Sequence, residues 1–257
     1  MSEAAQPRFP TESGCPDAFQ YMHPAYIKNY GQWDWHERTR PGVLHHVSKT
    51  GDEVWTVRVG TQRQLGPFEL NLLCDIIDKY ADGYVRFTIR SNMEVTVTDE
   101  KKVQPLIDAF EEAGYPVGGT GNSVTMISHT QGWLHCDIPG TDASGVVKSL
   151  MDELYDEFVN ETMPNRVHIT TSCCQINCGG QGDIAINVQH TKPPKINHDL
   201  VANACERPSV VARCPVAAIR PAMVNGKPSL EVDEKKCICC GACLPTMPTN
   251  AFKLTVK

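Results

Sequence analysis

The sequence contains no apolar run that approaches the roughly 20 residues needed to cross a bilayer. Its first residues, MSEAAQPRFPTESGC, lack a positively charged segment followed by an apolar one, so they do not resemble a secretory signal. Lysine and arginine number 24 against 30 acidic residues, and the net charge of -6 argues against a general binder of phosphate backbones. We therefore expect a soluble, cytoplasmic protein with no membrane span and no nucleic-acid partner.

Motifs of several common enzyme classes are also missing. No Ser/His/Asp arrangement, paired-carboxylate motif, phosphate-binding Walker loop or G-x-G-x-x-G after a strand is present, and GGTG at 118–121 indicates only a turn. The composition itself is that of an ordinary globular protein, with 41% apolar and 21% charged residues. The 257 residues are enough for one large domain or two modest ones with a real hydrophobic core.

Cysteine is scarce in the first two thirds of the chain and abundant in the last third. Of 12 cysteines, only Cys15, Cys74 and Cys136 lie in residues 1–172, and nine lie in the last 85 residues. Without an export signal the thiols should stay reduced, so clustered cysteines are better interpreted as metal ligands than as disulfides. The sequence therefore predicts a metal-binding protein.

The pattern of apolar residues predicts an α+β fold. Residues 1–50 are rich in proline, histidine and aromatic residues and show no strand or helix period, so we expect an extended arm. The next segment, 51–122, shows the order β-α-β-β-α typical of a small α+β unit. Its predicted elements are strands at 54–59, 84–90 and 93–97 and helices at 67–82 and 103–114.

Two further domains are predicted after this unit. In residues 123–204, a strand, a helix at 144–161 and a strand at 166–172 lead directly into a group of cysteines at 173–178, so the end of a strand presents these cysteines. Residues 205–257 are short, loop-rich and dense in cysteine, which is typical of a separate small module.

The strongest motif is the C-x2-C-x2-C run formed by Cys237, Cys240 and Cys243. This spacing lets one tight loop place three thiolates on three corners of an iron–sulfur cubane. The fourth cysteine of the bacterial ferredoxin pattern, which serves a second cluster there, is replaced by Met247. We predict that Cys214 supplies the fourth ligand and that Cys239 is free. Structural zinc is the alternative, although its sites usually use two separate C-x2-C pairs.

A second cysteine group follows the predicted strand at 166–172. Cys173 and Cys174 are adjacent, so their side chains diverge and can bind one object only if it is larger than a single ion; Cys178 follows, with glycines after it. A fourth ligand could come from Cys136, Cys74 or Cys15. We choose Cys136 because it lies in a polar loop, whereas Cys74 lies in an amphipathic helix and is expected to be a buried apolar residue.

Basic residues are few but locally arranged. Arg58, Arg63, Arg86 and Arg90 come from neighbouring predicted strands, and Arg86 and Arg90 are an even number of residues apart, which predicts that they share one face of a sheet. This face could bind an anion, or the arginines could simply pair with carboxylates in solvent. A second and weaker anion-binding set consists of Lys192, Lys195, His168 and His190.

Several segments, in this order, resemble the β subunit of dissimilatory sulfite reductase: HTQGWLHC, TSCCQINCGG, KPPKINHDL, CPVAAIRP and CICCGAC, preceded by VRVG and RFTIR. The resemblance covers nearly the whole chain. It implies ferredoxin-like sirohaem-reductase half-domains followed by an inserted [4Fe-4S] module, and therefore two [4Fe-4S] clusters and sirohaem.

The resemblance also implies a role for each cysteine and arginine. One cluster, coupled to sirohaem through a thiolate of Cys178, would be held by Cys136, Cys173, Cys174 and Cys178, and the ferredoxin-type cluster by Cys214, Cys237, Cys240 and Cys243. Sulfite and the sirohaem carboxylates are anions, so Arg58, Arg86 and Arg90 are the candidate catalytic and cofactor-binding arginines.

The family further implies an enzyme that interconverts sulfite and sulfide by transfer of six electrons. Its partners would be an α subunit in an α2β2 assembly, a small sulfur carrier with a C-terminal cysteine, and an electron donor or acceptor. The stretch from Gln175 to Cys243 is most similar to the reverse-operating type of sulfur oxidisers. The family's β subunit continues beyond the ferredoxin-type run, so we expect a fragment or an altered end at Lys257.

Two other functions are compatible with the same residues. One is a ferredoxin-like electron carrier with no catalytic centre of its own, which would need only the C-x2-C-x2-C run and its distant fourth ligand. The other, related to sulfite reductase, is a sirohaem nitrite reductase. Cofactor content separates the first from sulfite reductase, and turnover of sulfite against nitrite separates the second.

Overall fold

A computed structural model describes residues 18–204, 206–246 and 251–253. The chain folds into two compact units. The first contains the described residues up to Gly118 except Ile89–Ser91, and the second contains Ile89–Ser91 and the described residues from Gly119 onward. Within the described chain, no helix is both long and apolar enough to span a membrane. Cys15, Met247 and Pro248 lie outside the described residues.

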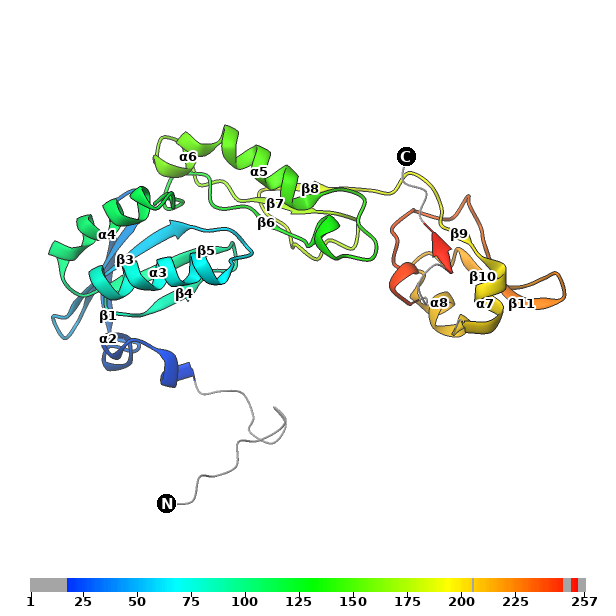
Figure 1. The fold of residues 1–257 in the computed structure, drawn as a ribbon, viewed down its shortest axis with the longest axis horizontal. Helices are drawn as coiled ribbons and strands as arrows, with labels where there is room; N and C mark the ends of the chain where they lie inside the picture. Colours follow the sequence, from blue (N-terminus) through cyan, green and yellow to red (C-terminus); the bar gives the residue numbers. More distant parts are fainter. Residues whose placement is uncertain (1–17, 205, 247–250, 254–257) are drawn as a thin grey trace, which may run out of the picture. The chain divides into compact units, whose positions relative to one another are not determined.

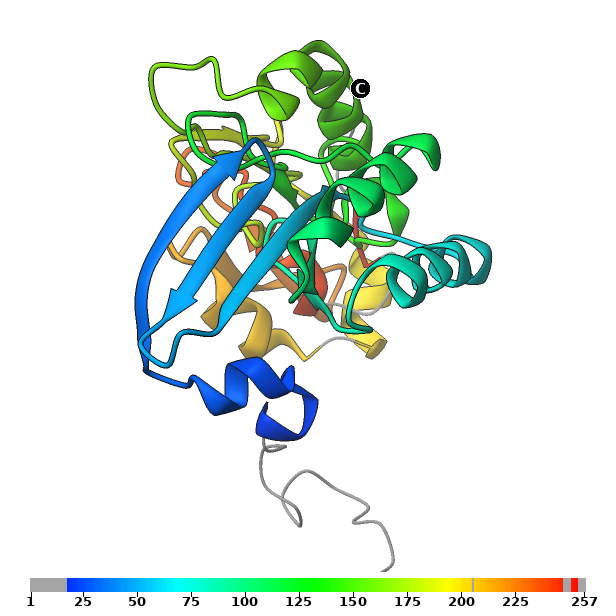
Figure 2. The ribbon, with the colours of Figure 1, turned by 90° about the vertical axis from the view of Figure 1, so that its left-hand side faces the viewer.

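The first unit is an antiparallel sheet with two helices on one face (Figures 1 and 2). The strand order is β1-β2-β3-β5-β4, and each neighbouring pair is antiparallel. The strands are β1 (Trp33–Arg40), β2 (Val43–Ser48), β3 (Glu53–Gly60), β4 (Val85–Phe87) and β5 (Asn92–Val97), and the helices are α3 (Pro67–Tyr80) and α4 (Glu100–Glu112).

The core of the first unit lies between this sheet and its helices. Alternate residues of β3 and β5 are fully buried, including Val57 and Val95, and they pack with Phe110 of α4. Helix α3 begins at Pro67, whose fixed φ suits a first turn, and the carboxylate of Glu69 accepts a hydrogen bond of 3.0 Å from the amide of Gly66. The strand–helix–strand–strand–helix order predicted from the sequence is confirmed.

The N-terminal segment differs from the expected arm. Beyond the short helices η1 (Ala18–Tyr21) and α2 (Pro24–Lys28), residues 33–48 form β1 and β2 of the sheet. Six of the eight residues of β1 are exposed, so its sequence carries no apolar alternation that would predict a strand. Strand β1 is instead held by cross-strand contacts of aromatic and histidine side chains, such as His46 against His36 and Trp33.

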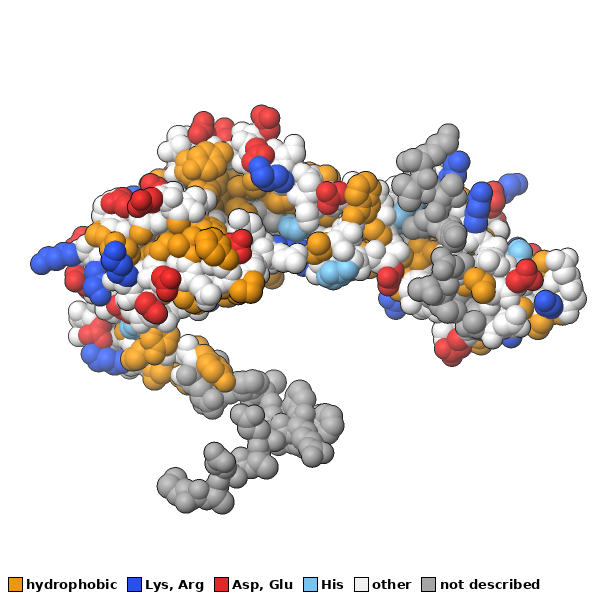
Figure 3. All heavy atoms as spheres, in the orientation of Figure 1, with side chains coloured by type: hydrophobic (Ala, Val, Ile, Leu, Met, Phe, Trp, Pro, Cys, Tyr) orange, Lys and Arg blue, Asp and Glu red, His pale blue; other side chains and the backbone are white. Residues whose placement is uncertain are grey.

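The second unit begins with a three-stranded parallel sheet in the order β6-β7-β8, beside α5 and α6 (Figure 1). The predicted helix over 144–161 is divided at Leu154. Acidic side chains gather on the exposed surface of α5 and α6, in keeping with the negative net charge (Figure 3). The bounds are β6 (Ser128–His129), η2 (Gly132–Leu134), α5 (Ala143–Glu153), α6 (Tyr155–Val159), β7 (Ile169–Ser172) and β8 (Ile184–Asn187).

The last part of the second unit contains short helices and a β-hairpin around a small core. The hairpin turns at Asn225 and Gly226, which both have positive φ, a pattern typical of a type I′ turn that the sequence analysis did not use. Val201, Val210 and Leu230 are fully buried in this core. The elements are β9 (Lys195–Ile196), α7 (His198–Ala204), α8 (Arg207–Arg213), β10 (Ile219–Val224), β11 (Lys227–Val232), η3 (Leu244–Thr246) and β12 (Phe252–Lys253).

Candidate functional site

The C-x2-C-x2-C run lines one pocket together with the cysteine that was predicted to complete it. Cys214, Cys237, Cys240 and Cys243 all contribute to the wall of this pocket. Cys214 follows α8 directly, and the other three lie in the loop between β11 and η3. The amide of Cys237 donates to the carbonyl of Asp233 at 3.0 Å, which fixes the start of this loop. The structure therefore brings the four predicted ligands together.

The surroundings of the cysteine sulfurs in this pocket affect how they could bind a metal. Burial, with smaller contributions from the thiols of Cys240, Cys237 and Cys214, raises the pKa of Cys243 to about 12. A metal that binds Cys243 must therefore displace the proton of its thiol. The amide of Ala218 donates to the sulfur of Cys214 at 3.2 Å, a contact that also suits a metal-bound thiolate. These residues fit an iron–sulfur cluster.

Cys239, which was predicted to be free, lies in the same loop. It has a positive φ of 55° and lines the same pocket as the four predicted ligands. Its thiol points toward the carbonyl of Cys237, at 4.0 Å. Burial, followed by the charge and hydrogen bonding of Cys237, raises the pKa of Cys239.

The second cysteine group forms where β7 ends. Cys173 and Cys174 follow β7 and are buried, and Cys136 lies after η2 and packs against them. The amide of Cys173 donates to Thr130 Oγ1 at 2.9 Å. Burial raises the pKa of Cys174 to about 11, with smaller contributions from Cys173, Cys136 and Cys178. Cys136, Cys173 and Cys174 therefore pack together, and Cys178 is near enough to affect Cys174 electrostatically.

The cysteines of this group differ from one another in exposure. Cys178 is exposed to solvent, while Cys173 and Cys174 are buried. Cys74, which was considered as a ligand and expected to be buried, is exposed on α3 in the first unit. Among the described residues, no three His, Cys, Asp or Glu side chains are arranged around a single metal ion. In a cubane, by contrast, each thiolate binds a different iron.

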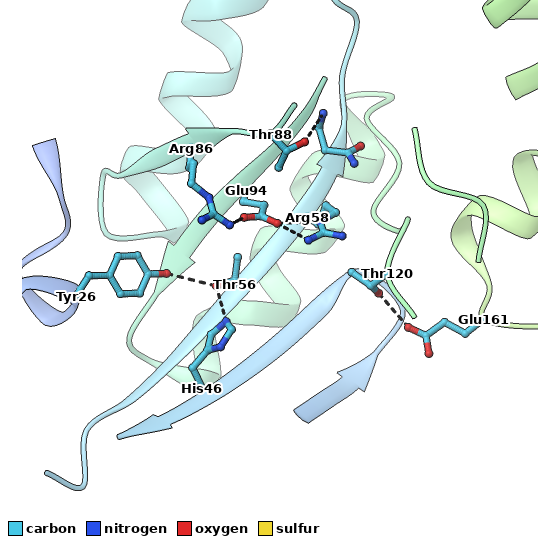
Figure 4. Close-up of polar contacts among 10 residues, drawn as sticks. Tyr26, His46, Thr56, Arg58, Arg86, Thr88, Glu94, Thr120 and Glu161 are labelled. Atoms are coloured by element: carbon cyan, nitrogen blue, oxygen red, sulfur yellow. Dashed lines mark hydrogen bonds and ion pairs between the residues drawn. The ribbon is translucent and has the colours of Figure 1, made fainter. Parts of the chain in front are cut away.

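Two of the predicted anion-binding arginines hold a buried carboxylate (Figure 4). Arg58 donates to Glu94 Oε1 through Nε at 2.9 Å, and Arg86 pairs with Glu94 Oε2 from the other side. The side chain of Glu94 is only 2% exposed. Burial opposes its ionisation, but the hydrogen bonds and charges of Arg86 and Arg58 outweigh burial and lower its pKa. The pairing of arginines with carboxylates, weighed as an alternative above, therefore applies to both.

The same sheet face carries a network of polar side chains. Thr56 and Thr96 alternate with the buried valines of β3 and β5, so they point away from α3 and α4. Tyr26 Oη lies 3.1 Å from Thr96 Oγ1 and 3.4 Å from Thr56 Oγ1, and His46 Nε2 lies 2.9 Å from Thr56 Oγ1 (Figure 4). Burial and the neighbouring His36 lower the pKa of His46 to about 4.

Replacing Glu94 with glutamine should lower the free energy of unfolding by about 2–4 kcal/mol at pH 7, because two arginines lose a buried partner. The folded pKa of Glu94 lies below its ordinary value of 4.5, so its contribution is complete above pH 4.5 and disappears as the pH falls through the folded pKa. Urea unfolding of both proteins at pH 7 and at lower pH measures this. A stability difference that stays constant on acidification would contradict the pairing.

Arg90 does not share a sheet face with Arg86. Strand β4 ends at Phe87, and Arg90 lies in a turn next to Ser91, which has a φ of 60°. The prediction of a strand to residue 90 is therefore wrong, and the two-residue period no longer applies. Arg90 lies close to His168 in the second unit, where burial and then the charges of Arg90 and Arg166 lower the pKa of His168.

The weaker set of Lys192, Lys195, His168 and His190 does not form one pocket. Lys192 and Lys195 line an open hollow that also contains Glu231 and Glu234. His168 directly precedes β7, and its Nδ1 lies 3.6 Å from a carboxylate oxygen of Asp183. Its Nε2 is buried without a hydrogen-bond partner. His190 is buried and donates to the carbonyl of Ile138. Glu94 was missed in the sequence, although a carboxylate inside the apolar strand MEVTV is a signal that could have identified it.

Comparison with known proteins first identifies the fold of this chain. Residues 46–113 match the model of the nitrite/sulfite reductase ferredoxin-like half domain. A crystal structure titled dissimilatory sulfite reductase I matches 91% of this chain and 61% of its own with a TM-score of 0.76 at 16% identity, which shows a shared fold.

Curated relatives identify the family. The β subunit of dissimilatory-type sulfite reductase from Archaeoglobus fulgidus is 44% identical over 93% of this chain and 67% of its own length. The subunit of the same name from Megalodesulfovibrio gigas is 41% identical over 90% of this chain and 93% of its own length. The chain belongs to the family of dissimilatory-type sulfite reductase β subunits, and the family resemblance predicted from the sequence is confirmed.

The chain and its relatives differ in length. This chain spans 64% of the relative from Nitratidesulfovibrio vulgaris at 40% identity, about two thirds of the relative from Archaeoglobus fulgidus, and nearly all of the one from Megalodesulfovibrio gigas. It is also similar to an α subunit of dissimilatory-type sulfite reductase from Allochromatium vinosum, at 22% identity over 70% of this chain. The two kinds of subunit therefore share sequence features.

Proposed function

We propose that this chain is the β subunit of a sulfite reductase that interconverts sulfite and sulfide at a sirohaem coupled to a [4Fe-4S] cluster. In the reductive direction, sulfite accepts six electrons and six protons and releases three water molecules as it becomes sulfide. The observation that carries the proposal is the presence of two separate groups of four cysteines in one chain of this family.

We assign the cluster that adjoins sirohaem to the second cysteine group. Cys136, Cys173 and Cys174 are wholly or partly buried, and Cys178 is exposed. Its exposure suits the shared ligand, because the sulfur of Cys178 would remain accessible to sirohaem while it helped to hold the cluster. These four cysteines would belong to the domain predicted at 123–204.

We assign the ferredoxin-type cluster to Cys214, Cys237, Cys240 and Cys243, in the module predicted at 205–257. Their shared pocket and the raised pKa of Cys243 support this assignment. When bound, such clusters store and pass single electrons, and the protein sets their potentials through burial and hydrogen bonds to sulfur. The amide of Ala218, which donates to Cys214, is one such hydrogen bond.

The arginines have different roles in this proposal. Arg86 keeps 76% of its side chain exposed while one nitrogen holds Glu94, so it can present positive charge to an anionic substrate or a sirohaem carboxylate. Arg58 is 21% exposed and positions Glu94, and through it Arg86. Arg90 adds positive charge near His168. All three would stabilise negative charge and orient a proton donor as S–O bonds break.

The proposed partners follow from the same assignment. We propose an α subunit in an α2β2 assembly, a small sulfur carrier with a C-terminal cysteine, and an external electron donor or acceptor, all in the cytoplasm. The match to an α subunit supports a pair of related chains. The direction of the reaction depends on the potential of the external donor.

The chain co-produced anaerobically with its α subunit should show sirohaem absorption and reduce sulfite with a reduced viologen as donor. The family model also covers nitrite reductases, so nitrite turnover is measured beside it. Sulfite kcat/KM should exceed that of nitrite. Sirohaem bands with faster turnover of nitrite would indicate a nitrite reductase, and a spectrum with iron–sulfur bands alone would indicate an electron carrier.

A further inference from the structure

His190 lies between the two cysteine groups. His190 follows strand β8 in the sequence, and the residue is 7% exposed. Nε2 donates a hydrogen bond of 3.0 Å to the carbonyl of Ile138, two residues beyond Cys136. The imidazole is therefore attached to the loop that carries one of the ligands of the sirohaem-side group.

The same ring packs against the ferredoxin-type run. A Cβ atom on Gly241 would lie 3.2 Å from both Cδ2 and Nε2 of His190, and Gly241 directly follows Cys240 in the sequence. Gly241 has a φ of +78°, a conformation that favours glycine. A Cβ on Gly140 would lie 3.5 Å from Cε1 of the ring, and the amide of Gly140 donates to the carbonyl of Cys173 at 2.7 Å. The ring thus touches backbone next to ligands of both groups.

Two neighbouring contacts continue this connection. Gln189 Nε2 donates to the carbonyl of Ile238, inside the C-x2-C-x2-C run, at 3.2 Å. The side chain of Leu244 packs both against the hydrophobic cluster that contains Cys173 and against the one that contains Cys243. The ferredoxin-type loop is therefore connected to the part of the fold that carries the second cysteine group at three adjacent places.

We propose that His190 is a positioning residue that sets the distance between the two clusters, so that a single electron passes directly from the ferredoxin-type cluster to the cluster beside sirohaem. The inference rests on the two clusters of the proposed function. In this step one cluster is oxidised and the other reduced by one electron, supplied by an external low-potential donor. No bond forms or breaks. A rigid planar ring, close-packed between two glycines, holds backbone more firmly than a flexible side chain would.

The test uses His190→Ala and His190→Gln in the full chain with its α subunit. Dithionite-reduced samples are examined by electron paramagnetic resonance for the broadening that two nearby reduced clusters cause. Hydrogen exchange at the amides of Gly140 and Gly241 is measured on the same proteins. We expect weaker broadening in His190→Ala and amide exchange faster by about tenfold, the equivalent of one lost buried hydrogen bond. The side-chain amide of a glutamine can donate to the carbonyl of Ile138. In His190→Gln, part of the spectral broadening and part of the amide protection should therefore return.

His198→Ala is the matched control. His198 lies in the ferredoxin-type part, where its Nδ1 lies 2.8 Å from Ser229 Oγ, and its replacement should leave both readouts unchanged. Wild-type broadening and exchange in His190→Ala would overturn the inference. If that variant binds too little iron for spectroscopy, hydrogen exchange is measured in the metal-free chain instead. Exchange in metal-free His190→Ala and in Gly241→Ala is then compared with the metal-free wild type, and unchanged exchange overturns the inference. A wild-type chain that lacks two clusters would refute the proposed function, whereas unchanged exchange in His190→Ala would refute the role of His190.

Discussion

Replacing Cys178 with serine should uncouple sirohaem from its neighbouring cluster and lower sulfite kcat by about 100-fold or more, since changing even an outer-shell partner of a metal ligand costs about 10–100-fold. The exposed thiolate of Cys178 is the proposed bridge between the two irons. The signal of the ferredoxin-type cluster should remain, because its four ligands lie in a different pocket. Mössbauer and electron paramagnetic resonance spectra measure the coupling directly.

Cys74→Ser is the control for this prediction. Cys74 is also exposed but belongs to α3 of the first unit, whereas both cysteine groups belong to the second unit. Its replacement should leave the spectra and turnover unchanged. Retained coupling in Cys178→Ser would show that another residue is the bridge, and loss of both cluster signals would show that the two groups do not bind clusters independently.

Replacing Cys243 with serine should remove the ferredoxin-type cluster, so that the iron content of the chain falls by about half, from two four-iron clusters to one. Cys243 is the most buried cysteine of its group, at 8% exposure, and serine oxygen is a poorer ligand for iron than thiolate. Electron delivery to sirohaem should fall with it, while the sirohaem absorption stays. Iron analysis and the optical spectrum of the same sample measure both effects.

Cys239→Ser provides the comparison for Cys243→Ser. Cys239 lines the same pocket and belongs to the same loop but is not a proposed ligand. Its replacement should leave the iron content at the wild-type value. An equal loss of iron in Cys239→Ser and Cys214→Ser, or a normal content in Cys243→Ser, would require a different set of four ligands.

The cysteine spacing made the ferredoxin-type pocket predictable. Three thiols separated by two residues each must lie on one loop, and the Cys214–Pro215 pair was a reasonable source for the fourth. The structure brings all four together. The order of elements in the first unit was predictable for a similar reason, since the apolar residues of β3, α3 and β5 follow regular periods.

The arginine site could not be predicted in the same way. Whether Arg58 and Arg86 face an anion or a carboxylate depends on the register of β3 and β4 against β5, which places both opposite Glu94. The spacing of residues within a single strand does not determine how that strand pairs with its neighbour. Strand β1 was missed because its exposed side chains show no apolar alternation, and pairing with β2 rather than burial defines it.

The position of His190 was also beyond sequence analysis. A single histidine in a loop carries no pattern, and its partners, Ile138 and Gly241, are about 50 residues away on either side. Only the tertiary fold brings them to one ring. Its burial, rather than its residue type, distinguishes it from a solvent-exposed histidine in a loop.

The most direct test of the account is the iron and acid-labile sulfide content of the anaerobically purified chain in complex with its α subunit, assigned to this chain by comparing Cys243→Ser and Cys174→Ser with the wild type. We predict about eight iron and eight sulfide per chain beyond the sirohaem iron, from two four-iron clusters, with each variant losing about half. Zinc in place of iron, or no acid-labile sulfide, would contradict the account.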